Sequence, residues 1–284
     1  MEKGTILTTH ASRYEIGECL GRGAQGSVYQ AYRSDGAPVA IKLIREVTTD
    51  SLQRQGTELR AYQDFPNQFV RLLDWNLTCT RPFLVLEFCI HGSARLQLGY
   101  LSTWHSVTLP LLGQASGALE ELHRHGYLYR DFKPDNLLLT QYGFGPWVAK
   151  LGDAGLICLP RQLRLVQVTQ FARGTPEYLA PELFVPGALY TQQAEAFAFG
   201  ITAVEMLTGS RPPAGSRISA GPNEIHTLLT DLISRDPSAR PTLHHARLQL
   251  EAASENLRNR NRAIGAVAVF GLVILAGVAF SKNK

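Results

Sequence analysis

The 284-residue chain contains only four cysteines, and none of them forms a C-x-x-C pair. Most of the four lie in apolar runs, where a free thiol behaves as a small hydrophobic side chain: Cys19, Cys79, Cys89 and Cys158. This pattern excludes a zinc ribbon and a disulfide framework built on paired cysteines. It favours reduced thiols in a cytoplasmic compartment, with a disulfide or metal role as the alternative.

A strong excess of one charge is also lacking. The formal net charge is +4, from 28 Lys and Arg against 24 Asp and Glu, and arginines cluster near residues 247–262. An excess this small and this local does not support nucleic-acid binding. Residues 1–13 lack the apolar core of a secretory signal, so we expect a flexible N-terminal leader there.

The overall composition is that of a globular protein, with 45% hydrophobic and 18% charged residues and no internal repeats or low-complexity segments. It excludes disordered and fibrous classes. A chain of this length can bury one large core or build two lobes around a shared cleft.

One long apolar run is present, because residues 263–280, AIGAVAVFGLVILAGVAF, contain no charged or amide side chain. As a helix rising about 1.5 Å per residue, the run would span about 27 Å, close to the ~30 Å hydrocarbon core of a bilayer. We therefore predict a transmembrane helix. A buried core helix is the alternative, although such helices usually keep a polar face.

Basic residues flank this run. Arg258, Arg260 and Arg262 precede it, whereas only Lys282 and Lys284 follow. The positive-inside rule then favours a cytoplasmic location for the preceding domain. We predict a basic juxtamembrane linker at residues 251–262, a single-pass C-terminal membrane anchor and a short tail at 281–284, with the oligomeric state left open.

The pattern of strands and helices predicts two lobes. A helix is expected at residues 51–63, with Asp50 or Ser51 as its N-cap, and helices dominate from about residue 109. Alternating or β-branched runs predict strands at residues 14–20, 27–32, 39–44, 69–76 and 83–88. The fold class is α+β: a small antiparallel β lobe at 14–89, a larger helical lobe at 90–250, and the transmembrane helix.

A glycine-rich segment, GRGAQGSVY, places Gly21, Gly23 and Gly26 in a G-x-G-x-x-G pattern. The residues that follow alternate as in a strand, which argues against a dinucleotide-binding turn, where a helix must begin. Such a hairpin can lay backbone N–H groups over phosphates. An ordinary hairpin is the alternative.

Lys42 follows Gly26 by sixteen positions, inside the apolar run PVAIKLI. A charge in a half-buried strand is costly unless it has a partner. Glu58, on the predicted helix, is a candidate partner, and phosphate oxygens of a nucleotide could take the other donors. A lysine that reaches solvent from an edge strand is the alternative.

Two further segments carry groups suited to phosphoryl transfer. LYRDFKPDNLLL holds Asp131, Lys133 and Asn136 within six residues, and VAKLGDAGL ends an apolar strand with Asp153. A carboxylate can take a hydroxyl proton, a lysine can offset phosphate charge, and amide and carboxylate oxygens suit Mg²⁺. A solvated polar turn is the alternative for the first segment.

Taken together, residues 14–248 resemble the eukaryotic-type protein kinase family. The motifs that carry the resemblance are GRGAQGSV, VAIK, Glu58, YRDFKPDN, GDAG, GTPEYLAPE and RDPSARPT, in this order. The resemblance implies an ATP- and Mg²⁺-dependent protein serine/threonine kinase, because Lys133 in D-F-K-P-D-N and Thr175 in G-T-P-E-Y fit that branch.

The resemblance also implies roles for individual residues. Asp131 would be the catalytic base, Lys133 would contact the γ-phosphate, and Asn136 and Asp153 would hold magnesium. Lys42 would bind the α- and β-phosphates and pair with Glu58. The expected ATP site consists of Leu20, Gly21, Gly23, Gly26, Val28, Ala40, Lys42, Glu87 and Cys89. Leu86 would be the gatekeeper, residues 87–89 the hinge, and Glu182 and Arg240 a structural pair.

Three positions depart from the family pattern. Tyr129 stands in place of the usual histidine, Ala154 in place of a phenylalanine, and Glu195 where an aspartate usually anchors the catalytic loop. Phosphorylation of the loop between Gly155 and Glu182 stays open. Thr169 is a candidate acceptor, and a phosphate in this loop would meet Arg130, next to the catalytic aspartate. An ATP-binding pseudokinase acting as a membrane scaffold, or a small-molecule phosphotransferase, is the alternative to an active kinase with membrane-proximal protein substrates.

Overall fold

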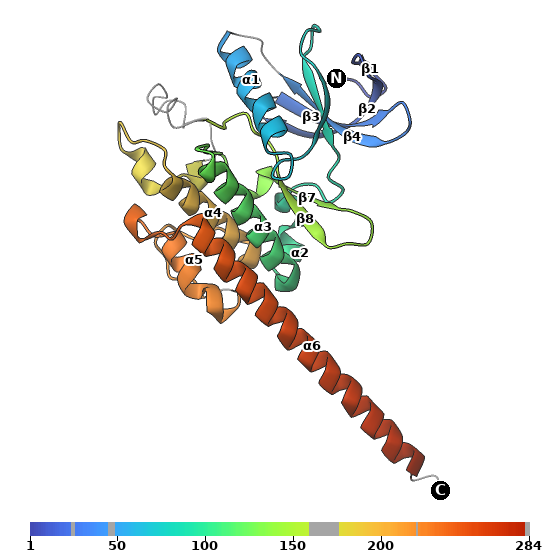
Figure 1. The fold of residues 1–284 in the computed structure, drawn as a ribbon, viewed down its shortest axis with the longest axis vertical. Coiled ribbons are helices and arrows are strands. Elements are labelled where there is room, and N and C mark those ends of the chain that lie inside the picture. The colour runs from blue at the N-terminus through green and yellow to red at the C-terminus, as the bar shows by residue number, and fades with distance from the viewer. Residues whose placement is uncertain (24–25, 45–48, 159–175, 220, 282–284) are drawn as a thin grey trace.

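A computed structural model describes the chain in two lobes followed by a long helix (Figure 1). Its description covers the 284 residues except 24–25, 45–48, 159–175, 220 and 282–284. The side chains of residues 49–55 and 265–281 also lie outside the description.

The N-terminal lobe is built on a six-stranded sheet in the order β1-β2-β3-β4-β6-β5, and every neighbouring pair is antiparallel. Its strands are β1 Ile6–Thr8, β2 Arg13–Gly23, β3 Gly26–Arg33, β4 Pro38–Ile44, β5 Leu72–Asn76 and β6 Phe83–Glu87. Alternation buries one face of these strands, for example Tyr29 and Ala31 of β3 against Val39 and Ile41 of β4. The strands predicted from the sequence are confirmed, with shifted ends.

The prediction of a flexible leader at residues 1–13 is wrong for residues 6–8, which form strand β1. Ile6 pairs with Glu15 and Thr8 with Arg13. The backbone N–H of Gly4 also donates to the Ile16 carbonyl at 2.8 Å. The leader therefore includes a strand at one edge of the sheet, which satisfies backbone groups that β2 would otherwise leave unpaired.

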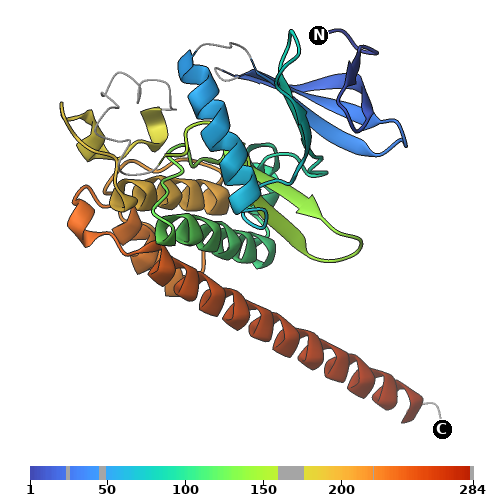
Figure 2. The ribbon, with the colours of Figure 1, turned by 45° about the horizontal axis from the view of Figure 1, so that its top comes forward.

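One helix, α1 (Thr49–Asp64), belongs to this lobe and lies beside the sheet (Figures 1 and 2). It contains the predicted helix at residues 51–63. The predicted N-cap residues, Asp50 and Ser51, lie inside the helix, which begins at Thr49, and their side chains lie outside the description. Ala61 and Tyr62 on its inner face are buried.

The C-terminal lobe is mainly helical. Its helices are α2 Leu98–Leu101, α3 His105–Arg124, α4 Gln192–Thr208, α5 His226–Leu232 and the start of α6 Leu243–Ser281. A two-stranded ribbon, β7 (Leu137–Gln141) with β8 (Trp147–Leu151), lies between the lobes (Figures 1 and 2). Short 3₁₀ turns occupy Ala94–Gln97, Pro134–Asn136, Pro176–Tyr178, Pro181–Phe184, Asn223–Ile225 and Pro237–Ala239.

Helix α4 forms the centre of this lobe. It begins where the Thr191 side chain accepts a hydrogen bond from the Ala194 N–H at 3.2 Å, and it ends at Gly209, whose φ of +77° suits glycine. Residues 194–207 are all buried. At Gly200 a Cβ would lie 2.7 Å from the Leu232 Cβ, so only glycine lets α5 approach this closely.

Helix α6 packs on α3 before it leaves the lobe. The Ser116 hydroxyl donates to the Leu243 carbonyl at 2.8 Å, and the Arg247 guanidinium donates to the Glu120 carboxylate at 2.8 Å. The separate linker expected at residues 251–262 is wrong, because the helix is continuous from Leu243 to Ser281 and buries Ala253 and Ser254.

Among the residues searched, which are those the structure describes, no helix is long and apolar enough to cross a membrane. The transmembrane segment predicted at residues 263–280 falls largely on positions whose side chains lie outside that description.

Candidate active site

Three charged side chains meet between the sheet of the first lobe and the ribbon of the second. The Lys42 ammonium donates to the Glu58 carboxylate at 2.5 Å and to Asp153 Oδ1 at 2.7 Å. Lys42 and Glu58 are buried, with side chains 6% and 7% exposed, whereas Asp153 is 27% exposed. The predicted pairing of Lys42 with Glu58 is therefore confirmed, and Asp153 joins it.

This arrangement keeps Lys42 charged. Burial by itself lowers the pKa of a lysine, but the carboxylates of Asp153 and Glu58 outweigh it and hold the pKa of Lys42 well above its usual value. The position of Lys42 follows from β4, where it pairs with Val28 on one side and Leu84 on the other. A permanently charged ammonium at this site is able to bind phosphate oxygens.

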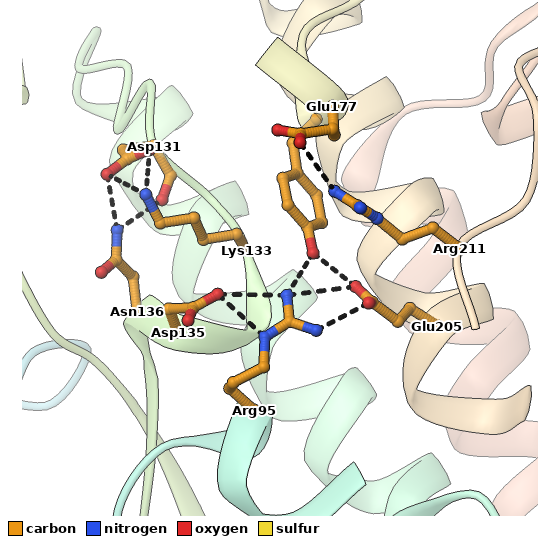
Figure 3. Close-up of polar contacts among 9 residues, drawn as sticks. Arg95, Asp131, Lys133, Asp135, Asn136, Glu177, Glu205 and Arg211 are labelled. Atoms are coloured by element: carbon orange, nitrogen blue, oxygen red, sulfur yellow. Dashed lines mark hydrogen bonds and ion pairs between the residues drawn. The ribbon is translucent and has the colours of Figure 1, made fainter. Parts of the chain in front are cut away.

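Asp131, Lys133 and Asn136 form a second group (Figure 3). Both carboxylate oxygens of Asp131 accept from the Lys133 ammonium at 2.9 Å, and Asp131 Oδ2 accepts from Asn136 Nδ2 at 2.8 Å. The Gly152 N–H donates to the Asn136 carbonyl at 2.8 Å, which places this group next to Asp153. Burial raises the pKa of Asp131, against the lowering effect of Lys133, and a raised pKa makes the carboxylate a better proton acceptor.

The loop that carries Asp131 is anchored by Glu195 of α4. This carboxylate is fully buried, accepts from the Arg130 backbone N–H at 2.7 Å, and binds His123 Nε2 at 2.6 Å. Arg130 has a φ of +72°, a conformation that costs energy for a side chain other than glycine. Glu195, although longer than the usual aspartate, thus still bonds the backbone of the loop. Its second partner, His123, was not predicted from the sequence.

The glycine-rich hairpin joins β2 to β3, with Gly23 opposite Gly26. At Gly26 a Cβ would lie 2.0 Å from the Leu43 carbonyl oxygen, so glycine is required there. At Gly21 and Gly23 no described atom lies within 4 Å of a Cβ. The protein itself does not demand glycine at these two positions, and the approach of a phosphate to them stays a prediction.

The remaining residues of the predicted nucleotide site lie on strands β2, β3, β4 and β6 and just after β6. Leu20 is exposed, and Val28 and Ala40 are partly buried. Leu86, Glu87 and Cys89, the predicted gatekeeper and hinge, are buried at and just after the end of β6. Burial raises the pKa of the Cys89 thiol to about 12, so it is protonated and inert at neutral pH.

A third polar network, absent from the sequence analysis, centres on Arg95 (Figure 3). Its guanidinium donates to Asp135 at 3.1 Å and to Glu205 at 2.7 Å. It also donates to the Tyr178 hydroxyl, which in turn donates to Glu205. The network joins the catalytic loop, α4 and the turn after residue 175 through side chains that are up to 110 positions apart in sequence.

Aromatic rings pack near Ala154, the residue that stands in place of a phenylalanine. Ala154 is fully buried, and Tyr62 of α1 donates from its hydroxyl to the Gly152 carbonyl at 3.2 Å. Tyr62 packs edge-on against Phe69, with ring centroids 5.5 Å apart, and Phe69 lies 5.9 Å from Tyr129. These rings connect α1 of the first lobe to Tyr129 of the second. The Tyr129 hydroxyl has no hydrogen-bond partner among the described residues.

The structural pair on the far side of the lobe is confirmed. Arg240 donates to both oxygens of Glu182, at 2.7 and 2.8 Å, and to the Gln193 and Ser234 carbonyls. The side chain of Arg240 is completely buried. The predicted substrate-side residue, Thr175, and the candidate phosphorylation site, Thr169, lie outside the described residues.

The two-lobed fold places a buried lysine–glutamate pair of the β lobe next to a loop with a partly buried aspartate, lysine and asparagine. These are the chemical groups needed for phosphoryl transfer. Residues 14–249 match the family model of the protein kinase domain. The chain therefore belongs to the protein kinase family.

The curated relatives are kinases by name, and two of them are named serine/threonine-protein kinases. The chain is 30% identical over 226 residues to wall-associated receptor kinase-like 3 of Arabidopsis thaliana, covering 76% of this chain and 30% of the relative. It is 33% identical over 219 residues to serine/threonine-protein kinase Pkn1 of Myxococcus xanthus, covering 73% and 30%. It is 31% identical over 269 residues to probable serine/threonine-protein kinase PBL8 of Arabidopsis thaliana, covering 89% and 61%. The chain thus spans about 30% of the length of the first of these relatives.

Proposed function

We propose that this chain is an active serine/threonine protein kinase that transfers the γ-phosphate of ATP to hydroxyl groups of proteins. The observation that carries the proposal is the buried contact of Lys42 with both Glu58 and Asp153. A buried ion group of this kind contributes little to stability, because desolvation offsets most of the attraction. Its position between the sheet of the first lobe and the end of β8 favours a functional role.

The roles follow from the contacts. Lys42 would bind the α- and β-phosphates while Glu58 holds its ammonium in place. Asp131 would accept the proton of the substrate hydroxyl, and Lys133, which now contacts Asp131 at 2.9 Å, would turn toward the γ-phosphate.

The donor set fits magnesium. Asn136 uses its amide nitrogen on Asp131, so its amide oxygen is the atom suited to a metal. Asp153 supplies carboxylate oxygens, and Mg²⁺ prefers such hard oxygen ligands together with phosphates. When bound, MgATP supplies the phosphoryl group and the cation that offsets its charge.

The test is phosphoryl transfer by the full chain from radiolabelled ATP to a generic basic protein, with Lys42→Met and Asp153→Ala beside it. The proposal predicts label on serine or threonine with wild type and its loss in both variants. ATP binding by wild type without transfer under any divalent metal would favour the alternative, a pseudokinase that acts as a membrane scaffold. A matched control is Lys3→Met, a change at an exposed lysine that pairs with Glu18.

We also propose that residues 263–280 hold the kinase domain on the cytoplasmic face of a membrane. The support is the uncharged composition of this run and the arginines that precede it. Tethering would favour membrane-proximal protein substrates through their effective concentration.

Flotation with liposomes tests the anchor. The full chain is expected to float, and the variant Leu272→Arg/Leu275→Arg is expected to remain at the bottom of the gradient, because charges in the hydrocarbon core are costly. The same double change outside the run, at the surface residues Leu73 and Leu248, serves as the control. A wild-type chain that does not float would refute the anchor and leave the kinase proposal intact.

A further inference from the structure

The carboxylate of Glu87, in the segment that joins the two lobes, is held from both sides. Glu87 Oε1 accepts from the Arg71 backbone N–H at 3.0 Å, and Oε2 accepts from Arg71 Nε at 3.1 Å. The Tyr142 hydroxyl donates to the same Oε2 at 3.1 Å. Glu87 is 7% exposed, so these three bonds take the place of its hydration.

The two partners belong to different lobes. Arg71 directly precedes β5 of the N-terminal lobe, and its carbonyl accepts from the Glu87 N–H at 2.9 Å. Tyr142 directly follows β7 of the C-terminal lobe, at the turn of the β7–β8 ribbon. A rotation of one lobe against the other would therefore have to break or stretch the Tyr142–Glu87 bond.

The ribbon that carries Tyr142 is itself firmly attached. The His91 N–H donates to the Leu139 carbonyl at 3.1 Å, and the Leu139 N–H donates to the Gly92 carbonyl at 2.8 Å. The His91 ring stacks on Trp147, with centroids 3.8 Å apart, and Trp147 stacks in turn on Tyr100. These contacts fix the position of the ribbon, and therefore of Tyr142, although the Tyr142 side chain itself is largely exposed.

We propose that Tyr142 is a positioning residue that ties the β7–β8 ribbon to the hinge at Glu87, limits the opening of the lobes and thereby prolongs nucleotide binding. The proposal rests on the proposed function, because it assumes that the nucleotide lies between the lobes beside residues 87–89. Glu87 links the ribbon to the nucleotide site. Its main chain continues from β6 into the segment predicted to contact adenine, and its side chain accepts the hydrogen bond from Tyr142. Losing this bond lowers the cost of opening and leaves the groups predicted to touch the reacting phosphate in place.

The donor is suited to this role. Burial, and then the negative charge of Glu87, raise the pKa of the Tyr142 hydroxyl, so it keeps its proton at physiological pH. A hydrogen bond to a carboxylate is stronger than one between neutral groups. Because Tyr142 is 52% exposed, water replaces part of the lost bond, and we expect an effect of about three- to tenfold.

The experiment measures binding and release of a fluorescent ADP, mant-ADP, by the full-length chain and by Tyr142→Phe. The variant is expected to release mant-ADP about three to ten times faster, with a matching rise in Kd. The rate of the single-turnover phosphoryl transfer at saturating ATP is expected to stay unchanged. If Tyr142 only stabilised the fold, its loss would not speed up nucleotide release while leaving the rate of phosphoryl transfer unchanged.

Two controls make the result specific. Tyr100→Phe changes another exposed tyrosine of the same lobe, whose hydroxyl makes no hydrogen bond to the residues that the structure describes, and is expected to match wild type. In a Glu87→Ala background, the effect of Tyr142→Phe is expected to disappear, because the bond is already broken.

Three outcomes would overturn the proposal. They are a release rate for Tyr142→Phe equal to that of wild type or Tyr100→Phe, an effect that persists undiminished in Glu87→Ala, and a wild-type chain that binds no nucleotide. Only the last of these also refutes the proposed function.

Discussion

Replacing Glu58 by glutamine removes one negative charge from the buried group that it forms with Lys42 and Asp153, while nearly keeping its shape. Lys42 Nζ then faces a neutral amide in place of the carboxylate at 2.5 Å and keeps the charged Asp153 at 2.7 Å. The ammonium should shift toward Asp153, away from the position where it meets phosphate oxygens. Asp153, held more tightly by Lys42, should also become a poorer magnesium ligand.

The size of the effect follows from burial. Both side chains of the Lys42–Glu58 pair are less than a tenth exposed, at 6% and 7%. A hydrogen bond to a charged group contributes about 1.5–3 kcal/mol net. At about 1.36 kcal/mol for each factor of ten, Glu58→Gln should lower kcat/KM for ATP by about ten- to a hundredfold. It should also raise the magnesium concentration needed for half-maximal rate.

Initial rates at varied ATP and varied magnesium test this prediction. Glu15→Gln, the same change at an exposed position of β2, is the matched control and should behave as wild type. A kcat/KM for Glu58→Gln within about twofold of wild type, a difference no larger than independent surface changes produce, would refute the reasoning.

Two further predictions concern stability. Arg240→Ala should lower the free energy of unfolding by about 3–5 kcal/mol in chemical denaturation, because it removes a completely buried guanidinium that bonds both oxygens of Glu182 and the Gln193 and Ser234 carbonyls; a loss no greater than that of Glu182→Gln would contradict this. Burial alone would raise the pKa of Glu120, but hydrogen bonds from Arg247 and His244 lower it below the usual value. The contribution of Glu120 is therefore present above its unfolded-state pKa and lost as pH falls through its lower folded-state pKa. Glu120→Gln should reduce the fall of Tm between about pH 5 and pH 3, and an unchanged slope would refute it.

The residues of the candidate site were largely predictable from local sequence. Lys42 lies in a strand whose alternation buries it, so it needed an anion, and the helix that carries Glu58 was visible as a pattern. The structure brings these two together as predicted. Asp131, Lys133 and Asn136 lie within six residues, so their contacts depend on one tight turn.

Other features were not predictable. Strand β1 has only three residues, too few for alternation to reveal it, and it forms because the edge of β2 offers unpaired backbone groups. Residues 251–262 looked like a linker because they are rich in arginine and asparagine, but the face of α6 that contacts α3 keeps them helical. A charged sequence forms a stable helix when one face is packed.

The sequence by itself determined the family, the two lobes and the identity of the groups available for phosphoryl transfer, because these depend on residue type and on spacings within short segments. Only the tertiary structure decided the partners of Arg95, which lie 40 to 110 positions away, and the bond from Tyr142 to Glu87 across 55 positions. The reason is physical. Each of these contacts exists only after two lobes or two helices have packed at one distance and angle, and that geometry is set by the sum of many buried side chains.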